Sequence, residues 1–188
     1  LDATSGAAAN GFDRALIEAH ARDLQSITRR VLESEKVFIA AVHGWAVGAG
    51  FEWALNCDLS VWGETAHAFF PEVRLGMFPT GGVTALLPRI VGANRAREML
   101  LLGDRYSSSD LQRFGLATRV VPDSSVIETA ECEARRICEF PPAAVAMLKR
   151  ALVRAATLSL DDVLDFEVEC LVGAAMQSQQ KLFGGDDG

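Results

Sequence analysis

Hydrophobic residues recur every three to five positions over residues 12–34, and this spacing predicts an amphipathic helix. Residues 37–42 form a continuous apolar run instead. Because the run is short, rich in β-branched residues and ended by His43-Gly44, it favours a strand buried on both faces. A glycine-rich stretch over residues 44–50 indicates a turn, and a helical period resumes over residues 51–56.

The rest of the chain is predicted in the same way. Further strands are expected at 59–62, 68–70 and 116–121, and further helices at 94–102, 108–114, 124–139, 143–156 and 160–180. Ser159 and Asp162 have the spacing of a helix capping box. Residues 1–11 are small and polar, so a mobile loop is expected there. The first half alternates strands and helices, whereas the last third is helical. We therefore predict an α/β core over residues 1–122 and a C-terminal helical region over 123–188 that serves packing between subunits.

Composition narrows the function classes. The 188 residues include 25 acidic and 18 basic side chains, for a net charge of −7, which argues against a nucleic-acid-binding surface. No apolar stretch reaches the roughly 18–20 residues that a membrane span needs. The four cysteines fit no zinc spacing and the three histidines are isolated, so no metal site is expected. Free thiols indicate a reducing compartment, and we expect a cytoplasmic protein.

Two glutamates carry the strongest chemical signal. Glu52 follows the turn Gly48-Ala49-Gly50, and Glu72 follows Phe69-Phe70-Pro71. Each lies beside apolar residues after a predicted buried strand. Two carboxylates in such surroundings can divide one proton between them, which is what acid/base chemistry on a water molecule requires. Each also has a simpler interpretation: Glu52 as an acid stabilised by the dipole of its helix, and Glu72 as an exposed acid after proline.

The glycine-rich turn offers a second chemical element. It lacks the third glycine of a dinucleotide fingerprint and the Gly-Lys-Ser/Thr of a phosphate loop. Its backbone N–H groups, at the start of a helix, are suited to a polarised carbonyl oxygen instead. The turn over residues 79–82 also opens a helix and is predicted either to line the same pocket, through Gly81, or to pack tightly. Trp45 and Phe78 are expected in the core or in the wall of an acyl pocket.

Several segments resemble the enoyl-CoA hydratase/isomerase (crotonase) superfamily in order and spacing. They are IAAVHGWAVGAGFEWALNCDLSV, AHAFFPEVRLGMFPTGG, LPRIVG, EMLLLGDRYSS and FGLATRVVP, within residues 37–122. The resemblance implies a ββα spiral core with a C-terminal helical trimerisation region. It further implies an acyl-CoA substrate, no cofactor beyond the coenzyme A of that substrate, and a homotrimer or a dimer of trimers.

The resemblance also implies roles for individual residues. Glu52 and Glu72 fall on the two catalytic glutamate positions of the hydratases, and Ala49 falls on a turn position whose N–H is one oxyanion donor. The family usually has glycine at the Ala49 position. Substrate contacts are expected from Trp45, Gly48, Gly50, Phe78 and Gly81.

The family pattern leads to an expectation about length and to three functional hypotheses. Family members have a longer N-terminal part, with the second oxyanion donor and much of the adenine pocket, so we expect that the N-terminal part of the core is missing here. The leading hypothesis is an enoyl-CoA hydratase that adds water to an α,β-unsaturated thioester. The alternatives are an enoyl-CoA isomerase, which uses only the carboxylate at the Glu72 position, and a non-catalytic acyl-CoA-binding or assembly subunit.

Overall fold

A computed structural model describes residues 13–183 of the chain, so the loop predicted at residues 1–11 lies outside the described residues. The strands are β1 (Ile39–Val42), β2 (Trp45–Val47), β3 (Leu59–Gly63), β4 (His67–Phe69), β5 (Tyr106–Ser107) and β6 (Arg119–Val121). The helices are α1 (Arg14–Glu33), α2 (Ala49–Asn56), α3 (Val83–Leu102), α4 (Ser108–Arg113), α5 (Val126–Cys138), α6 (Pro142–Ala155) and α7 (Leu160–Phe183). Two 3₁₀ turns are η1 (Val73–Leu75) and η2 (Asp123–Ser125).

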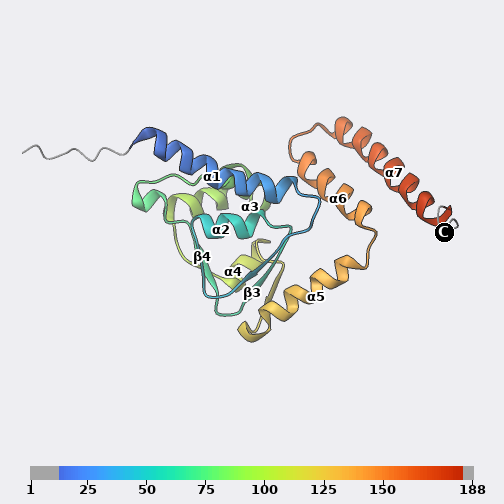
Figure 1. Ribbon diagram of the computed structural model, residues 1–188. Coiled ribbons are helices and arrows are strands. Elements are labelled where there is room, and N and C mark those ends of the chain that lie inside the picture. The colour runs from blue at the N-terminus through green and yellow to red at the C-terminus, as the bar shows by residue number, and fades with distance from the viewer. Residues whose placement is uncertain (1–12, 184–188) are drawn as a thin grey trace, which may run out of the picture.

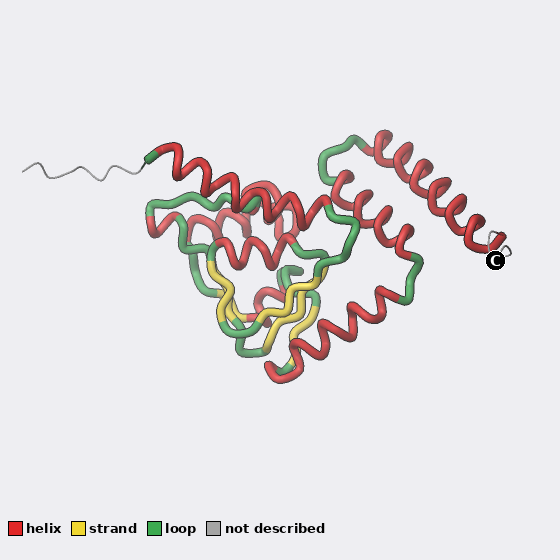
Figure 2. Tube along the Cα trace, viewed as in Figure 1, coloured by secondary structure: helices red, strands yellow, loops and turns green. Residues whose placement is uncertain are grey.

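The strands form two small sheets. One has the order β1-β3-β6 and is parallel throughout, with Ile39 opposite Leu59. The other has the order β2-β4-β5, with β2 and β4 parallel and β5 antiparallel to β4. Helix α1 packs on α2, and the strands lie below these helices in the view of Figure 1. Figure 2 shows the same layering, with red helices above the yellow strands. The α/β prediction is confirmed.

The predicted strand at 37–42 is present as β1, but its burial is incomplete. Alternate residues do pack on opposite faces: Ala40 and Val42 contact the main core, and Ile39 and Ala41 contact the cluster under α5. All four residues are nevertheless only partly buried. The strand thus packs on both faces as predicted, but it is less buried than expected because β1 is an edge strand of its sheet within the described residues.

Other differences from the predicted elements have local causes. Strands β2 and β5 were missed because they contain three and two residues, too few to show a period. Helix α3 begins at Val83, well before the predicted 94–102, because Pro88 and Gly92 interrupt the pattern. Gly92 is non-helical, with φ of 78° and ψ of 158°. The Ser159–Asp162 capping box is confirmed by a hydrogen bond of 2.6 Å between the two side chains.

The main core is aromatic and lies directly under the glycine-rich turn. Phe51 is fully buried, stacks on Phe70 at 4.6 Å between ring centroids, and meets the edge of Trp62 at 5.9 Å. Because Phe51 and Glu52 are adjacent on α2, this aromatic packing fixes the start of the helix and the backbone that carries Glu52.

Helices α6 and α7 pack against each other as a hairpin, visible beside the rest of the fold in Figure 1. The Lys149 ammonium of α6 is buried and joins this hairpin to the core. It donates to the Val31 and Lys36 carbonyls at 2.8 and 2.7 Å, and to Asp58 at 2.8 Å. Asp58 also accepts from the Phe38 N–H at 2.8 Å, so it joins the start of β1 to α6. The boundary at residues 122 and 123 stays a prediction.

Replacing Lys149 with methionine is expected to lower the free energy of unfolding by about 2 kcal/mol, because it leaves two backbone carbonyls and the partly exposed Asp58 carboxylate without the buried ammonium that donates to them. Urea denaturation measures the change. Arg135→Met is the matched control, since Arg135 makes an exposed ion pair with Glu131 and should contribute less than about 1 kcal/mol. Equal losses in the two variants would contradict the structural role of Lys149.

No helix among residues 13–183 combines the length and the apolarity needed to cross a membrane.

Candidate active site

Glu52 lies in the first turn of α2 with only 2% of its surface exposed. Its Oε2 atom accepts a hydrogen bond from the Val83 N–H, 3.3 Å away, at the start of α3. A carboxylate at the N-terminus of a helix is favoured by the free N–H groups and by the helix dipole. Glu52 therefore faces the start of a second helix while sitting in the first turn of its own.

Glu72 immediately precedes η1 and is 9% exposed. Its backbone carbonyl accepts from the N–H groups of Leu75 and Met77, at 3.0 and 2.7 Å, which fixes the residue. Its Oε2 atom is buried and has no hydrogen-bond partner among the residues that the structure describes. A buried carboxyl oxygen without a partner is costly, so a free oxygen of this kind is available to a ligand or to a proton.

Two glycines allow the carboxylates to sit this deep. A Cβ at Gly48 would lie 2.5 Å from Oε1 of Glu72, and a Cβ at Gly81 would lie 2.8 Å from Oε2 of Glu52. Gly48 also has φ of 55° and ψ of −123°, a conformation that other residues rarely adopt. Each carboxylate thus packs against the glycine turn that opens a helix, and the two predicted turns are brought to the same site.

The two carboxylates interact electrostatically. Burial, the largest cause, raises the pKa of the Glu52 carboxyl above its ordinary value of 4.5, and the negative charge of Glu72 raises it further. Backbone N–H groups of Val83, Gly81 and Thr80 act in the opposite direction on the same pKa. A carboxyl with a raised pKa can hold or release a proton closer to neutral pH, as a general acid or base must.

The raised pKa predicts how stability depends on pH. A folded-state pKa above the unfolded value stabilises the protein at low pH, and this contribution is lost as pH rises through the folded pKa. Glu52→Gln removes the ionisation. Its melting temperature should therefore rise relative to that of the wild type between pH 4 and pH 8. Thermal melts across this range measure the difference, with Glu169→Gln, a change at an exposed helix position, as the control. A difference that shrinks with rising pH would contradict the assignment.

Ala49 occupies the first helical position of α2. Its N–H makes no hydrogen bond among residues 13–183, whereas the Gly48 N–H donates to the Phe69 carbonyl at 3.1 Å. Within the described part of the chain, the Ala49 N–H is thus unpaired at the start of a helix, next to the glycine against which Glu72 packs. This geometry suits the oxyanion role predicted for Ala49. Gly50, one position later, has open space where a Cβ would point.

A cavity of about 360 Å³ adjoins Glu72. Its wall is otherwise mostly apolar and includes Val73, Phe78, Pro79, Pro88, Leu100 and Leu101. Phe78 is 72% exposed, so it belongs to the rim of this cavity rather than to the core. An apolar cavity that reaches a buried carboxyl is suited to a small acyl chain.

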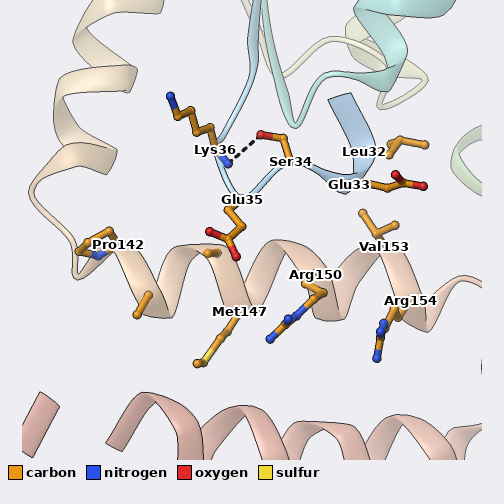
Figure 3. A pocket seen from close by; sticks show the side chains of 12 residues that line it. Leu32, Glu33, Ser34, Glu35, Lys36, Pro142, Met147, Arg150, Val153 and Arg154 are labelled. Atoms are coloured by element: carbon orange, nitrogen blue, oxygen red, sulfur yellow. Dashed lines mark hydrogen bonds between the residues drawn. The ribbon is translucent and has the colours of Figure 1, made fainter. Parts of the chain in front are cut away.

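A larger cavity of about 730 Å³ lies elsewhere, between residues 32–36 and helix α6. Figure 3 shows its charged side chains, with Glu33 and Glu35 on one side and Arg150 and Arg154 on the other. Neither Glu52 nor Glu72 lines it. Its size alone therefore does not make it the reaction site.

Trp45, which was predicted to contact the substrate, lies apart from the cavity beside Glu72. Its ring stacks on His67 at 4.9 Å, meets Phe69 edge to face, and carries the Arg105 guanidinium 5.2 Å from its centre. Trp45 is 55% exposed and does not line the Glu72 cavity. The structure brings together Gly48, Ala49, Glu52, Glu72 and Gly81, whereas the Trp45 ring packs with His67, Phe69 and Arg105.

Sequence reasoning missed two buried polar residues beside Glu52. Thr28 of α1 and Asn56 at the end of α2 are 8% and 5% exposed. Both donate to the Gly81 carbonyl, at 3.0 Å each. A polar residue at a buried helical position is the signal that could have indicated them, but which helix faces pack together is decided only by the fold.

No three histidine, cysteine, aspartate or glutamate side chains gather as a metal site in the part of the chain that the structure describes.

Comparison with known proteins agrees with this geometry. The family described as enoyl-CoA hydratase/isomerase matches residues 6–184. The chain is 34% identical to a probable mitochondrial enoyl-CoA hydratase of Dictyostelium discoideum over 81% of the chain and 55% of the relative. It is also 34% identical to the short-chain-enoyl-CoA hydratase of Clostridium acetobutylicum, over 82% of the chain and 59% of that protein. The chain thus spans a little over half the length of these relatives.

The fold is similar to that of a solved enoyl-CoA hydratase from Bacillus anthracis. The TM-score is 0.86 at 29% sequence identity, over 93% of the chain and 67% of that structure.

Proposed function

The chain belongs to the enoyl-CoA hydratase/isomerase family, and we propose that it takes part in adding water across the double bond of an α,β-unsaturated acyl-CoA thioester. The observation that carries this proposal is the pair of buried carboxylates at two glycine turns. Glu52 is hydrogen-bonded to the Val83 N–H, and Glu72 has an oxygen without a partner among the described residues. Hydration needs a base for the water and an acid for the α-carbon, and the pair supplies both.

The proposed steps follow from the geometry. The Ala49 N–H binds the thioester oxygen and stabilises the negative charge that develops on it as the enolate forms. Glu52, held by the Val83 N–H, orients the water and helps to remove its proton as oxygen bonds to the β-carbon. Glu72 delivers a proton to the α-carbon through its Oε2 atom, which has no partner among the described residues. The proton that Glu52 takes from the water then passes to Glu72 and restores the pair. The mostly apolar cavity beside Glu72 receives the acyl chain.

An isomerase of the same family is the second candidate, and one observation favours it. Of the two glutamates, only Glu72 has a buried oxygen without a partner among the described residues, and a single carboxyl can move a proton between two carbons of a substrate. Glu52 is then a neighbour that tunes the site rather than a reacting group. The presence of both carboxylates favours hydration.

The substrate and assembly are part of the proposal. The substrate is an acyl-CoA, and the reaction needs no cofactor beyond the coenzyme A that the substrate carries. A homotrimer or a dimer of trimers is supported by apolar side chains that remain exposed on α6 and α7, namely Leu148, Leu152, Leu160, Leu164, Val168 and Leu171. A cytoplasmic location stays a proposal.

The test follows the conjugated enoyl-thioester absorbance with purified protein. Hydration of crotonyl-CoA lowers this absorbance, whereas isomerisation of a 3-enoyl-CoA to its conjugated form raises it. Loss with crotonyl-CoA supports the hydratase. A rise with the 3-enoyl substrate and no loss with crotonyl-CoA supports the isomerase, and no change with either substrate contradicts both.

A further inference from the structure

Gly81 is held by a closed set of buried hydrogen bonds. The Thr28 hydroxyl donates to the Gly81 carbonyl at 3.0 Å, and the Asn56 side-chain amide donates to the same oxygen at 3.0 Å. The Asn56 amide also donates to the Thr28 hydroxyl oxygen at 3.1 Å. The three groups come from α1, from the end of α2 and from the turn before α3, so the set fixes three elements at one point.

The opposite side of the same turn carries Glu52. A Cβ at Gly81 would lie 2.8 Å from Oε2 of Glu52, and the Val83 N–H, two residues on, donates to that oxygen at 3.3 Å. Gly81 and Gly82 are adjacent, and Gly82 has φ of 95°. Two consecutive glycines have a wide choice of backbone conformations, so the position of the Val83 N–H depends on what holds the turn.

We propose that Thr28 and Asn56 are positioning residues that hold the Gly81 turn against the Glu52 carboxylate and so keep that carboxylate aimed at the substrate water. The inference rests on the proposed function for its catalytic consequence, though not for its effect on Glu52 itself. Neither residue touches the reacting atoms. Thr28 and Asn56 are themselves buried, and both act through the Gly81 carbonyl to which they donate.

The pH behaviour of Glu52 offers a readout that a merely structural role would not change. The Val83 N–H lowers the pKa of Glu52, against the larger effect of burial. Among the described residues, the negative charge of Glu72 also raises the pKa of Glu52. The variants below leave Glu72 in place. If the turn moves and this N–H is lost, the pKa of Glu52 should rise.

The first experiment measures that pKa directly and needs no catalytic activity. Protein labelled with ¹³C at the glutamate carboxyls is titrated by NMR, and the Glu52 signal is identified by its loss in Glu52→Gln. Thr28→Val and Asn56→Leu should raise the pKa of Glu52, while Thr28→Ser, which keeps the hydroxyl, should restore the wild-type value. An unchanged Glu52 titration in both Thr28→Val and Asn56→Leu overturns the inference.

The second experiment measures kinetics of the same variants. Thr28→Val and Asn56→Leu should lower kcat about tenfold with KM within about twofold, and the acidic limb of the kcat/KM profile should move to higher pH. Ser60→Ala is the matched control, because the Ser60 hydroxyl makes a comparable buried contact with the Leu116 carbonyl at 3.4 Å in another part of the fold. It should lower the melting temperature and leave the pH profile unchanged.

The two experiments separate the possible failures. An inactive wild type with a shifted Glu52 titration in Thr28→Val contradicts the proposed function and supports the positioning role. An active wild type whose kcat and pH profile are unchanged in both variants contradicts the positioning role and leaves the function standing. If Asn56→Leu does not fold, Thr28→Val alone decides the question, since valine matches threonine in shape.

Discussion

Replacing Glu72 with glutamine is expected to lower kcat for the hydration of crotonyl-CoA by about a thousandfold, with little change in KM. The reason is that glutamine keeps the shape of the side chain but cannot hold or deliver a proton, and general acid–base catalysis contributes roughly 10²–10⁴ in rate. The buried oxygen of Glu72 without a partner among the described residues is the group placed to do this. Steady-state kinetics measures the loss.

Two further variants make the Glu72 result specific. Glu52→Gln should cause a similar loss if the protein is a hydratase, and a much smaller one if it is an isomerase that uses Glu72 alone. Glu64→Gln, at an exposed position after β3, is the control and should keep the wild-type kcat. A Glu72→Gln enzyme that retains more than about a tenth of wild-type kcat would contradict the assigned role of Glu72.

Gly48→Ala is expected to reduce kcat/KM by about a hundredfold and to destabilise the protein by about 1–3 kcal/mol. The new Cβ would lie 2.5 Å from Oε1 of Glu72, so the carboxylate or the turn has to move. The backbone of Gly48, at φ of 55° and ψ of −123°, adds strain for any residue with a side chain. A displacement of about 1 Å at a reacting group is enough for a loss of this size.

Gly44→Ala separates the two causes of this loss. Gly44 also has a positive φ, of 70°, but a Cβ there meets nothing within 4 Å. The control variant should therefore lose stability and keep its activity per folded molecule. If Gly48→Ala and Gly44→Ala have the same kcat/KM, the close packing of Glu72 on Gly48 has no catalytic role.

The sequence predicted the long elements well and the short ones poorly. Amphipathic helices such as residues 160–180 have enough turns for a period to emerge, and the structure has α7 at Leu160–Phe183. Strand β5 contains only Tyr106 and Ser107 and exists because β4 pairs with it across the sheet. No local pattern carries that information, because the pairing joins residues far apart in the chain.

The residues of the candidate site were likewise predicted only in part. Glu52, Glu72 and the two glycine turns were identified because acids beside apolar residues and glycines are unusual locally, and the resemblance to the enoyl-CoA hydratase/isomerase family is confirmed by the match over residues 6–184. Thr28 was missed because its role depends on α1 packing over α2. The substrate contact that the resemblance implies for Trp45 stays a prediction, since its ring packs on His67 and lies outside the Glu72 cavity.

The most direct test of the central claim is to incubate the protein with crotonyl-CoA in ¹⁸O-labelled water and to analyse the acyl-CoA product by mass spectrometry. The wild type should form a hydroxyacyl-CoA that carries one ¹⁸O atom, and Glu72→Gln should form almost none. Crotonyl-CoA recovered without added oxygen, or labelled product formed equally by wild type and Glu72→Gln, would rule out hydration by this pair of carboxylates.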